Sequence, residues 1–170
     1  MTRNNSFKIW DMTSQADFDA ADLKPDMHRL LLDHWLTSRT DGSIPPKTAL
    51  DPLRLRSILR NLLMVEVHAP PTRFLVRLAG TEIDDLMGKS SSGYWLDEFP
   101  NTEPIIERFN WILKNKRPYY AIGRHYWPEG HFKEYNTLTV PYSRNGTDVD
   151  YIVSSCNFYW KSLFADKSPE

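Results

Sequence analysis

Two histidines, His125 and His131, are the residues whose types most directly suggest chemistry, because imidazole binds metal ions and exchanges protons near neutral pH. With one carboxylate they could supply three ligands to a zinc ion. If Trp127 pairs with Phe132 across the turn between them, His125 lies opposite Glu134 on the next strand. A cross-strand contact between imidazole and carboxylate explains this arrangement without a metal, and His131 would lie on the turn. The sequence therefore predicts no metal site.

The tripeptide Gly88, Lys89 and Ser90 is similar to the end of a phosphate-binding loop. That motif requires a strand leading directly into it and a glycine five residues before Gly88, where this chain has Ile83. We therefore expect no nucleotide phosphate site here.

Acidic residues gather in the same region, at Glu82, Asp84 and Asp85. In the first turn of a helix they are more simply explained as charges that complement the helix dipole than as an acid and a base. No nucleophile motif is present, so the sequence names no catalytic residue. A Ser-His-acid or Cys-His arrangement made by the fold stays open, as does a small enzyme that uses His125 and a carboxylate.

A third group of residues suits the binding of a small molecule. The candidate lining groups are three aromatic and three polar side chains: Tyr94, Trp95, Trp111, Asn136, Ser154 and Cys156. A cavity lined by aromatic rings with a few polar atoms is the usual design of a small-ligand site. The same residues could instead close the core, and the sequence does not decide which face of the strands lines a pocket.

Residues 73–99 hold the elements that must position these groups. Apolar residues alternate along 73–79, with Phe74, Val76 and Leu78 on one side, and this pattern predicts a strand. A strand followed by short, broken helices is typical of a small α+β domain that encloses a cavity above a sheet.

A short helix is predicted directly after this strand. Gly80 breaks the strand, and Thr81 is expected as the N-cap, with Asp84 in a weak capping box. The helix is expected to end at Gly88, where a left-handed C-cap suits glycine.

Apolar spacing predicts three more helices. One runs from Asp26 to about Ser38, one from Asp51-Pro52 to Asn61, and one from Pro104 to Lys116. Their buried stripes are Met27, Leu30, Leu31, His34 and Trp35; Leu53, Leu55, Ile58 and Leu59; and Ile105, Ile106, Phe109, Ile112 and Leu113.

Four extended runs, at 62–67, 117–127, 132–141 and 149–158, are predicted as further strands. The first forms a hairpin with 73–79, and the last three form a meander.

Length and composition exclude several classes of protein. The 170 residues carry 21 basic and 22 acidic side chains without a run of one sign, which disfavours nucleic-acid binding. The single cysteine, Cys156, cannot form an internal disulfide, and this suits a reducing cytoplasm. No apolar run reaches the ~20 residues of a membrane helix, and the N-terminus lacks the apolar core of a signal peptide. We expect a soluble cytoplasmic protein with neither a membrane nor a nucleic-acid partner.

The order of these elements, two strands, helices and three strands, resembles that of the PAS superfamily. Several details resemble bacterial single-domain PAS proteins of about this length. In the helices they are the helix ending in His34-Trp35 and the Asp51-Pro52-Leu53 entry into the next helix. In the remaining chain they are the strand and turn from Phe74 to Ile83, Gly88 followed by Gly93, and Leu138 to Pro141 before Asn145-Gly146. The likeness covers roughly Asp26 to Tyr159.

The resemblance implies an α+β fold with a five-stranded antiparallel sheet covered by short helices and an N-terminal amphipathic helix. We expect a polar segment at 1–25, the amphipathic helix and a linker at 26–43, the PAS-like domain at 44–160 and a tail at 161–170.

The resemblance also implies a sensory or regulatory module that binds a small molecule, or a ligand-free interaction scaffold, and it does not imply an enzyme. Its cofactor is unknown. In PAS relatives that use flavin photochemistry the reactive cysteine is in a short central helix, whereas Cys156 falls in the last strand. Haem relatives usually take their ligand from the middle helix, and 104–116 contains no histidine. The output would be a contact with another protein.

Two apolar segments suggest where such a contact forms. Both faces of the last strands carry apolar residues, so the helix at 26–38 is expected to cover one face, from its own chain or from a second copy. The end of the chain, from Phe158 to Phe164, is also too apolar to extend freely into water. We expect a homodimer or a regulatory partner surface built from these two ends.

Overall fold

The centre of the fold is one antiparallel sheet, seen in a computed structural model that describes residues 6–9, 12–15, 18–126 and 131–162. Within these residues the sheet has seven strands in the order β1-β2-β5-β6-β7-β3-β4. The strands are β1 Ser6–Ile9, β2 Met12–Gln15, β3 Leu62–His68, β4 Arg73–Ala79, β5 Tyr119–Tyr126, β6 His131–Tyr142 and β7 Tyr151–Ser162. Because β3 pairs with β7, the predicted hairpin and the predicted meander join in one sheet, and the expected five antiparallel strands are confirmed.

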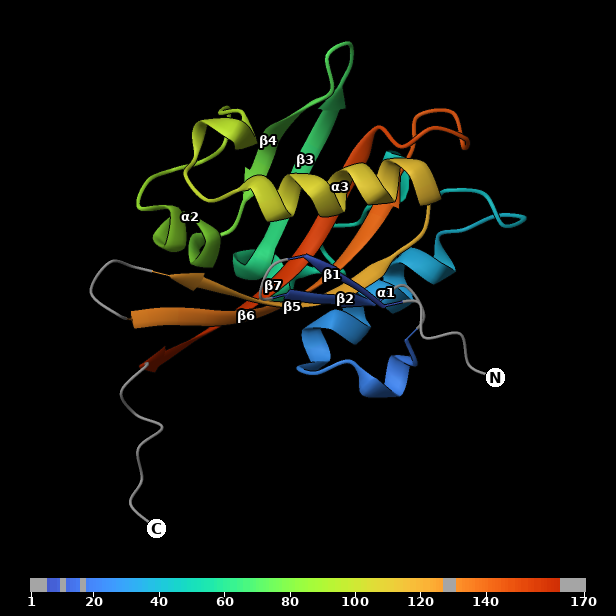
Figure 1. The fold of residues 1–170 in the computed structure, drawn as a ribbon. Coiled ribbons are helices and arrows are strands. Elements are labelled where there is room, and N and C mark those ends of the chain that lie inside the picture. The colour runs from blue at the N-terminus through green and yellow to red at the C-terminus, as the bar shows by residue number, and fades with distance from the viewer. Residues whose placement is uncertain (1–5, 10–11, 16–17, 127–130, 163–170) are drawn as a thin grey trace.

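Helices lie on both faces of this sheet (Figure 1). The helix α3, Glu103–Asn115, crosses one face, and α1, Asp26–Thr37, packs on the other. The helix α2, Thr81–Met87, follows β4. The predictions of these three helices are confirmed. Short 3-10 helices complete the chain: η1 Ala20–Asp22, η2 Lys47–Ala49, η3 Arg56–Asn61 and η4 Leu96–Glu98.

The pleat of the strands divides the interior into two cores. On β7, Ile152 and Cys156 join the core under α3, whereas Val153 joins the core under α1. We call these two sides of the sheet the α3 face and the α1 face. Their buried members include Val65, Phe74, Val76, Phe109, Ile112 and Tyr119 on the α3 face, and Leu31, Trp35, Leu55, Leu138, Val140 and Tyr142 on the α1 face.

The helix α1 covers the sheet of its own chain. Leu31 and Trp35 are buried, and the indole Nε1 of Trp35 donates a hydrogen bond of 2.6 Å to the carbonyl oxygen of Pro141. The apolar stripe of α1 therefore packs on its own chain, which is the first of the two arrangements that the sequence left open.

The apolar end of the chain also differs from its expected state. Because β7 continues to Ser162, residues 158–160 belong to the sheet, where Phe158 packs against the core of the α3 face. Leu163 and Phe164 lie outside the described residues.

The N-terminal segment contributes two strands that the sequence analysis did not predict. The strand β2 pairs with β5, with Ser14 opposite Ala121, and β1 pairs with β2 at the edge of the sheet. Backbone hydrogen bonds make such an edge without an apolar side-chain pattern, so the polar segment at 1–25 carried no strand signal.

The predicted helix after Asp51 is also wrong. The chain forms turns and then the 3-10 helix η3, and Leu53, expected to be buried, is 81% exposed. Leu55 and Ile58 are buried, as predicted, and their spacing of three suits a 3-10 helix because side chains at i and i+3 lie in line.

Two details around β4 differ from the prediction. A bulge places Leu78 opposite Met64 and Val76 opposite Val65, so Leu78 leaves the side of the strand that Val76 occupies. The N-cap of α2 is Gly80 rather than Thr81, which is the first helical residue.

Gly80, at the corner between β4 and α2, packs closely against the backbone of η3, and a substitution can test this contact. A Cβ atom there would lie 2.2 Å from the carbonyl oxygen of Arg60, although the backbone φ of −70° is open to any residue. We expect Gly80→Ala to lower the free energy of unfolding by about 1–3 kcal/mol or more, measured by urea denaturation. The control is Gly88→Ala, which has open space but a φ of +76° and should cost only about 1 kcal/mol. Equal effects of the two substitutions would contradict the close packing at Gly80.

Candidate functional site

Polar side chains are concentrated in the middle of the α3 face, across β5, β6 and β7. The strand register aligns them in three adjacent rows: Tyr119, Thr139 and Ser154; Ala121, Thr137 and Cys156; and Gly123, Tyr135 and Phe158. The central row has only small side chains. We call these three rows, together with Arg108 of α3, the polar layer.

Arg108 projects into this layer although it carries a charge. Its side chain is only 2% exposed, and its Nη2 donates a hydrogen bond of 3.3 Å to the hydroxyl oxygen of Tyr135. The guanidinium carbon also lies 5.9 Å from the centre of the Tyr135 ring, within the range of a cation–π contact. Burial of a charged group costs free energy, so the contacts that Arg108 makes in the core must offset this cost.

The other polar groups of the layer differ in how they are satisfied. The hydroxyl groups of Thr139 and Ser154 share a hydrogen bond of 2.8 Å. The hydroxyl oxygen of Thr137 is buried and has no hydrogen-bond partner in the described part of the chain. Burial raises the pKa of Cys156 to about 12, against the opposing charge of Arg108, so this thiol stays protonated at neutral pH.

Three of the six predicted pocket residues belong to this region. Ser154 and Cys156 lie in the polar layer, and Trp111 of α3 packs edge-on against Tyr119 with ring centres 6.2 Å apart. The structure therefore places these three residues on the α3 face.

The other three predicted residues lie elsewhere. Trp95 packs against His68, and Tyr94 is 42% exposed beside Phe99. Asn136 lies on the α1 face, because it is the neighbour of Thr137 in β6 and its side chain points the opposite way. The sequence could not assign this strand face, since both faces carry apolar residues.

The sequence analysis missed Arg108, Tyr135 and Thr137. A signal for Arg108 was present, because its position is three residues after Ile105 and four before Ile112, on the apolar stripe of α3. A charged residue on a buried stripe is rare unless it is paired or functional.

The α1 face contains a different polar group, centred on His28. The imidazole Nδ1 lies 2.7 Å from the hydroxyl oxygen of Ser155, and Nε2 lies 2.6 Å from the side-chain oxygen of Asn136. Ser155, His28 and Asn136 are linked in the order of a hydrolase triad. Both His28 and Ser155, however, are fully buried under α1. These contacts therefore join α1 to β6 and β7 and leave no nucleophile open to a substrate.

A second buried histidine, His34, also joins α1 to the rest of the chain. Its Nε2 accepts a hydrogen bond of 3.1 Å from the backbone N–H of Asp51. Burial lowers the pKa of His34, and the charge of Arg54 lowers it further. This is a packing role, as the sequence predicted.

The strand register alters the proposed partner of His125. Tyr126 pairs with Phe132, so His125 lies opposite Lys133, and Glu134 lies opposite Arg124. The side chains of His125 and His131 lie outside the described set. Among the side chains that the structure describes, no group of three histidine, cysteine or acidic residues is placed to hold a metal.

The acidic residues of α2 have structural partners. Glu82 forms an ion pair with Arg60, and Asp84 accepts hydrogen bonds from the backbone N–H and hydroxyl of Ser91, at 2.8 and 2.6 Å. The contact to Ser91 replaces the capping box that the sequence predicted.

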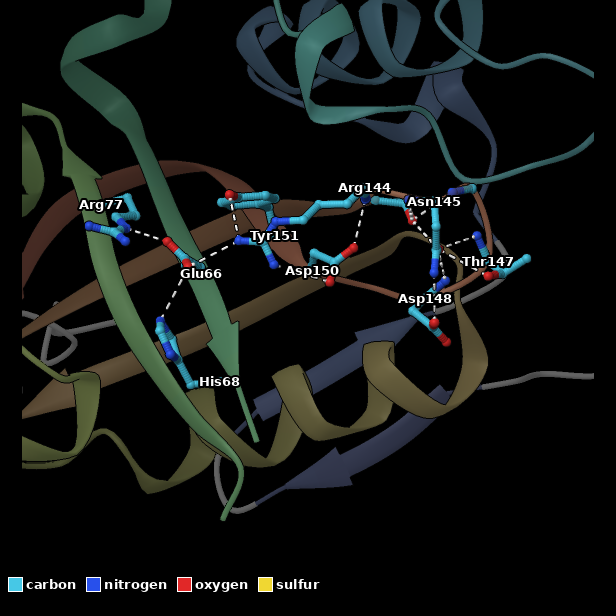
Figure 2. Close-up of polar contacts among 11 residues, drawn as sticks. Glu66, His68, Arg77, Arg144, Asn145, Thr147, Asp148, Asp150 and Tyr151 are labelled. Atoms are coloured by element: carbon cyan, nitrogen blue, oxygen red, sulfur yellow. Dashed lines mark hydrogen bonds and ion pairs between the residues drawn. The ribbon is translucent and has the colours of Figure 1, made fainter. Parts of the chain in front are cut away.

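A charged cluster stands at the end of β3, centred on the buried carboxylate of Glu66 (Figure 2). Its two oxygens accept hydrogen bonds from Arg77 and from Arg144, the latter at 3.1 Å, and His68 Nε2 lies 3.3 Å away. The hydrogen bond from Arg77 is the largest influence on the pKa of Glu66 and lowers it, although burial acts in the opposite direction. The cluster joins β3, β4 and the β6–β7 loop.

None of the helices in the described part of the chain is long and apolar enough to span a membrane.

The buried imidazole of His28 predicts a pH dependence of stability. Burial lowers its pKa below the ordinary value of 6.5, so the unfolded chain binds a proton that the folded chain does not. The free energy of unfolding should therefore be fully retained above about pH 6.5 and fall by up to about 1.4 kcal/mol per pH unit below it. In His28→Gln we expect a smaller fall between pH 7.5 and 5.5, measured by urea denaturation at each pH.

The matched control for this test is Leu36→Gln, an exposed position of the same helix, which should retain the wild-type pH slope. A His28→Gln protein with the full wild-type slope would show that this imidazole does not titrate on unfolding.

Substitution of Glu66 tests the charged cluster. We expect Glu66→Gln to lower the free energy of unfolding at pH 7 by on the order of 1 kcal/mol, because the arginines lose their carboxylate but stay half-exposed. Since the folded pKa of Glu66 is lowered, the difference from wild type should shrink as the pH falls below about 4.5. Asp97→Asn, in a more exposed pair with Arg73, should have a smaller effect. If both substitutions lower the free energy of unfolding equally, the burial of Glu66 does not strengthen its ion pairs.

Comparison with known proteins gives one family. Residues 23–99 match the model of a family described as a PAS domain. None of the curated proteins compared with the chain matches it.

Solved structures of similar shape include an RNA-binding Light-Oxygen-Voltage receptor, at 18% identity and a TM-score of 0.45 over 70% of this chain. This chain spans 35% of that receptor's length. A second is the LOV protein of Rhodobacter sphaeroides, at 14% identity and a TM-score of 0.42, with 82% of this chain and 69% of that one covered.

The match covers α1, the first hairpin and α2, and it ends before the meander of β5, β6 and β7. Residues 23–99 of this chain are therefore similar to a PAS domain.

Proposed function

We propose that this chain is a cytoplasmic sensory or regulatory module that binds a small molecule on the α3 face and signals through protein contacts. The observation that carries the proposal is the polar layer, which places Arg108 and the hydroxyl of Thr137 inside an otherwise apolar core. A core that serves only packing is built from apolar side chains, whereas a small-ligand site places a few polar atoms among apolar walls. The PAS-like unit at 44–160 would hold the ligand, with α1 as the cover of the opposite face.

A non-catalytic role is part of this proposal. The thiol of Cys156 has a pKa raised to about 12, and the hydroxyl of Ser155 is buried beneath α1. Neither group is placed to attack a substrate, since a nucleophile must be both activated and accessible.

The alternative is a ligand-free interaction scaffold. It is favoured by contacts within the polar layer, where Thr139 bonds to Ser154 and Arg108 to Tyr135. In either case, we propose a homodimer or a regulatory protein as the partner, and no nucleic acid. Its surface would lie outside the occupied stripe of α1.

Native mass spectrometry of the purified protein tests both functions. We expect a retained small molecule, released on denaturation, and an absorbance scan of the same sample would show at once whether it is coloured. The same spectra give the oligomeric state. A protein that carries no small molecule and accepts none from a metabolite extract would favour the scaffold. Trp111→Phe is an informative variant, since it should weaken retention without unfolding the chain.

A further inference from the structure

Three basic side chains gather around the charged cluster of Glu66. They are Arg77 on β4, Arg144 in the β6–β7 loop and Lys47 at the start of η2. The carboxylate of Glu66 joins Arg77 to Arg144 (Figure 2). The ring of Tyr151 contacts both Arg144 and Lys47, whose charged groups lie 4.8 Å and 5.5 Å from its centre. We call Lys47, Arg77 and Arg144 the basic surface.

The basic surface lies on the α1 face of the sheet. Glu66 is two residues from Met64 on β3 and opposite Tyr151 of β7, and both of these neighbours pack against the core of that face. The helix α1 packs on β6 and β7, whereas β4 is the last strand of the sheet on this side. Arg77 and Leu78 of β4 are accordingly exposed.

The carboxylates of this region lie deeper than the cations. The side chain of Glu66 is 10% exposed and that of Asp150 is 22% exposed. The side chains of Arg77 and Arg144 are 48% and 52% exposed. Lys47 is exposed as well, and it forms no ion pair with any residue that the structure describes. Three cations therefore lie over two carboxylates, and an approaching molecule meets the positive groups first.

The basic surface keeps donors and an apolar neighbour for a partner. Arg77 donates to Glu66 through Nε, and its two Nη groups have no hydrogen-bond partner among the described residues. A guanidinium fork matches a carboxylate in two parallel hydrogen bonds. Leu78 lies opposite Met64, on the same face of the sheet, and is 39% exposed. Arginine beside apolar side chains is a composition that protein interfaces favour.

The edge of β4 is already paired at its middle residue. The N–H of Val76 donates to the carbonyl oxygen of Tyr94 at 2.9 Å, and the carbonyl oxygen of Val76 accepts from the N–H of Gly93 at 2.8 Å. The chain's own segment thus occupies backbone groups that would otherwise accept a further strand. Recognition at this place therefore depends on side chains of the face.

We propose that the basic surface, together with Leu78, binds an acidic segment of a regulatory protein. This inference rests on the proposed function and names the chemistry of its protein partner. Carboxylates of the segment would bind the Nη groups of Arg77 and the charges of Arg144 and Lys47, and an apolar residue between them would contact Leu78. Because the three cations are exposed, their attraction to such a segment is screened by salt.

Two other occupants fit the basic surface less well. In a symmetric dimer through this surface, the same patch would lie on both sides of the contact, so the cations of one copy would meet those of the other. Nucleic-acid binding normally uses a basic stripe, whereas this chain has 21 basic and 22 acidic side chains without a run of one sign. An acidic protein segment complements both the charge and the apolar part of the surface.

The test compares an acidic peptide with its neutral counterpart. The probes are fluorescein-labelled Ser-Glu-Leu-Glu-Ser-Leu-Glu-Ser and the same peptide with Gln in place of Glu, titrated with the full-length protein and followed by anisotropy. We expect the acidic peptide to bind at least about fivefold more tightly at low salt. This preference should fall as the salt concentration rises, because the contacts are exposed.

Three variants assign the preference to this surface. We expect Lys47→Glu and Arg77→Gln each to reduce it about threefold or more. Lys47→Glu keeps the test informative if Arg77→Gln does not fold, because Lys47 does not contact Glu66 in the described structure. The matched control is Arg29→Glu on α1, which makes the same charge change in an exposed pair with Asp26 and should retain the preference. An equal loss in Arg29→Glu would show that only net charge matters and would overturn the proposal.

The remaining outcomes separate this inference from the proposed function. Equal binding of the two peptides, or binding of neither, would overturn the acidic partner. A uridine decamer that binds more tightly than the acidic peptide and is lost in Lys47→Glu would replace it with RNA, and a dimer that Lys47→Glu dissociates would replace it with a second copy. Retention of a small molecule in native mass spectra is measured without these peptides, so ligand binding stands or falls separately.

Discussion

The structure depends on a central sheet that is covered on both faces. Because β6 and β7 lie between α1 and α3, every side chain of their middle residues is directed into one core or the other. A polar side chain on these strands therefore has no access to water and must find a partner inside the molecule. This constraint explains why the polar residues form groups with defined contacts.

The two faces meet the constraint in different ways. On the α1 face, His28 is held between Ser155 and Asn136, whereas His34 Nδ1 and the hydroxyl of Tyr142 are buried without a hydrogen-bond partner in the described structure. On the α3 face, Arg108 brings a charge and Thr137 brings a hydroxyl without a partner in the described structure. The first arrangement holds a helix in place, whereas the second places a charged side chain inside a core.

The two faces of the sheet are covered by different parts of the chain. The α3 face lies under the helices that connect the first hairpin to the meander. The α1 face is closed by the chain's own N-terminal helix, through Trp35 and two buried histidines. The strand β7 joins the two faces, since its successive residues contact one core and then the other.

The sequence by itself determined the elements whose patterns are local. Periodicity located α1, α3 and the five principal strands, because burial on one face imposes a repeat that can be counted along the chain. It did not reveal β1 and β2, whose pairing depends on backbone hydrogen bonds, nor the 3-10 form of η3. Only the tertiary structure decided which face each strand residue occupies, since a shift of one residue exchanges the faces and both are apolar here. For that reason Asn136 and Thr137, neighbours in the sequence, lie on different faces of the sheet. The contact of Arg108 with Tyr135 joins α3 to β6, so it too depends on the tertiary structure.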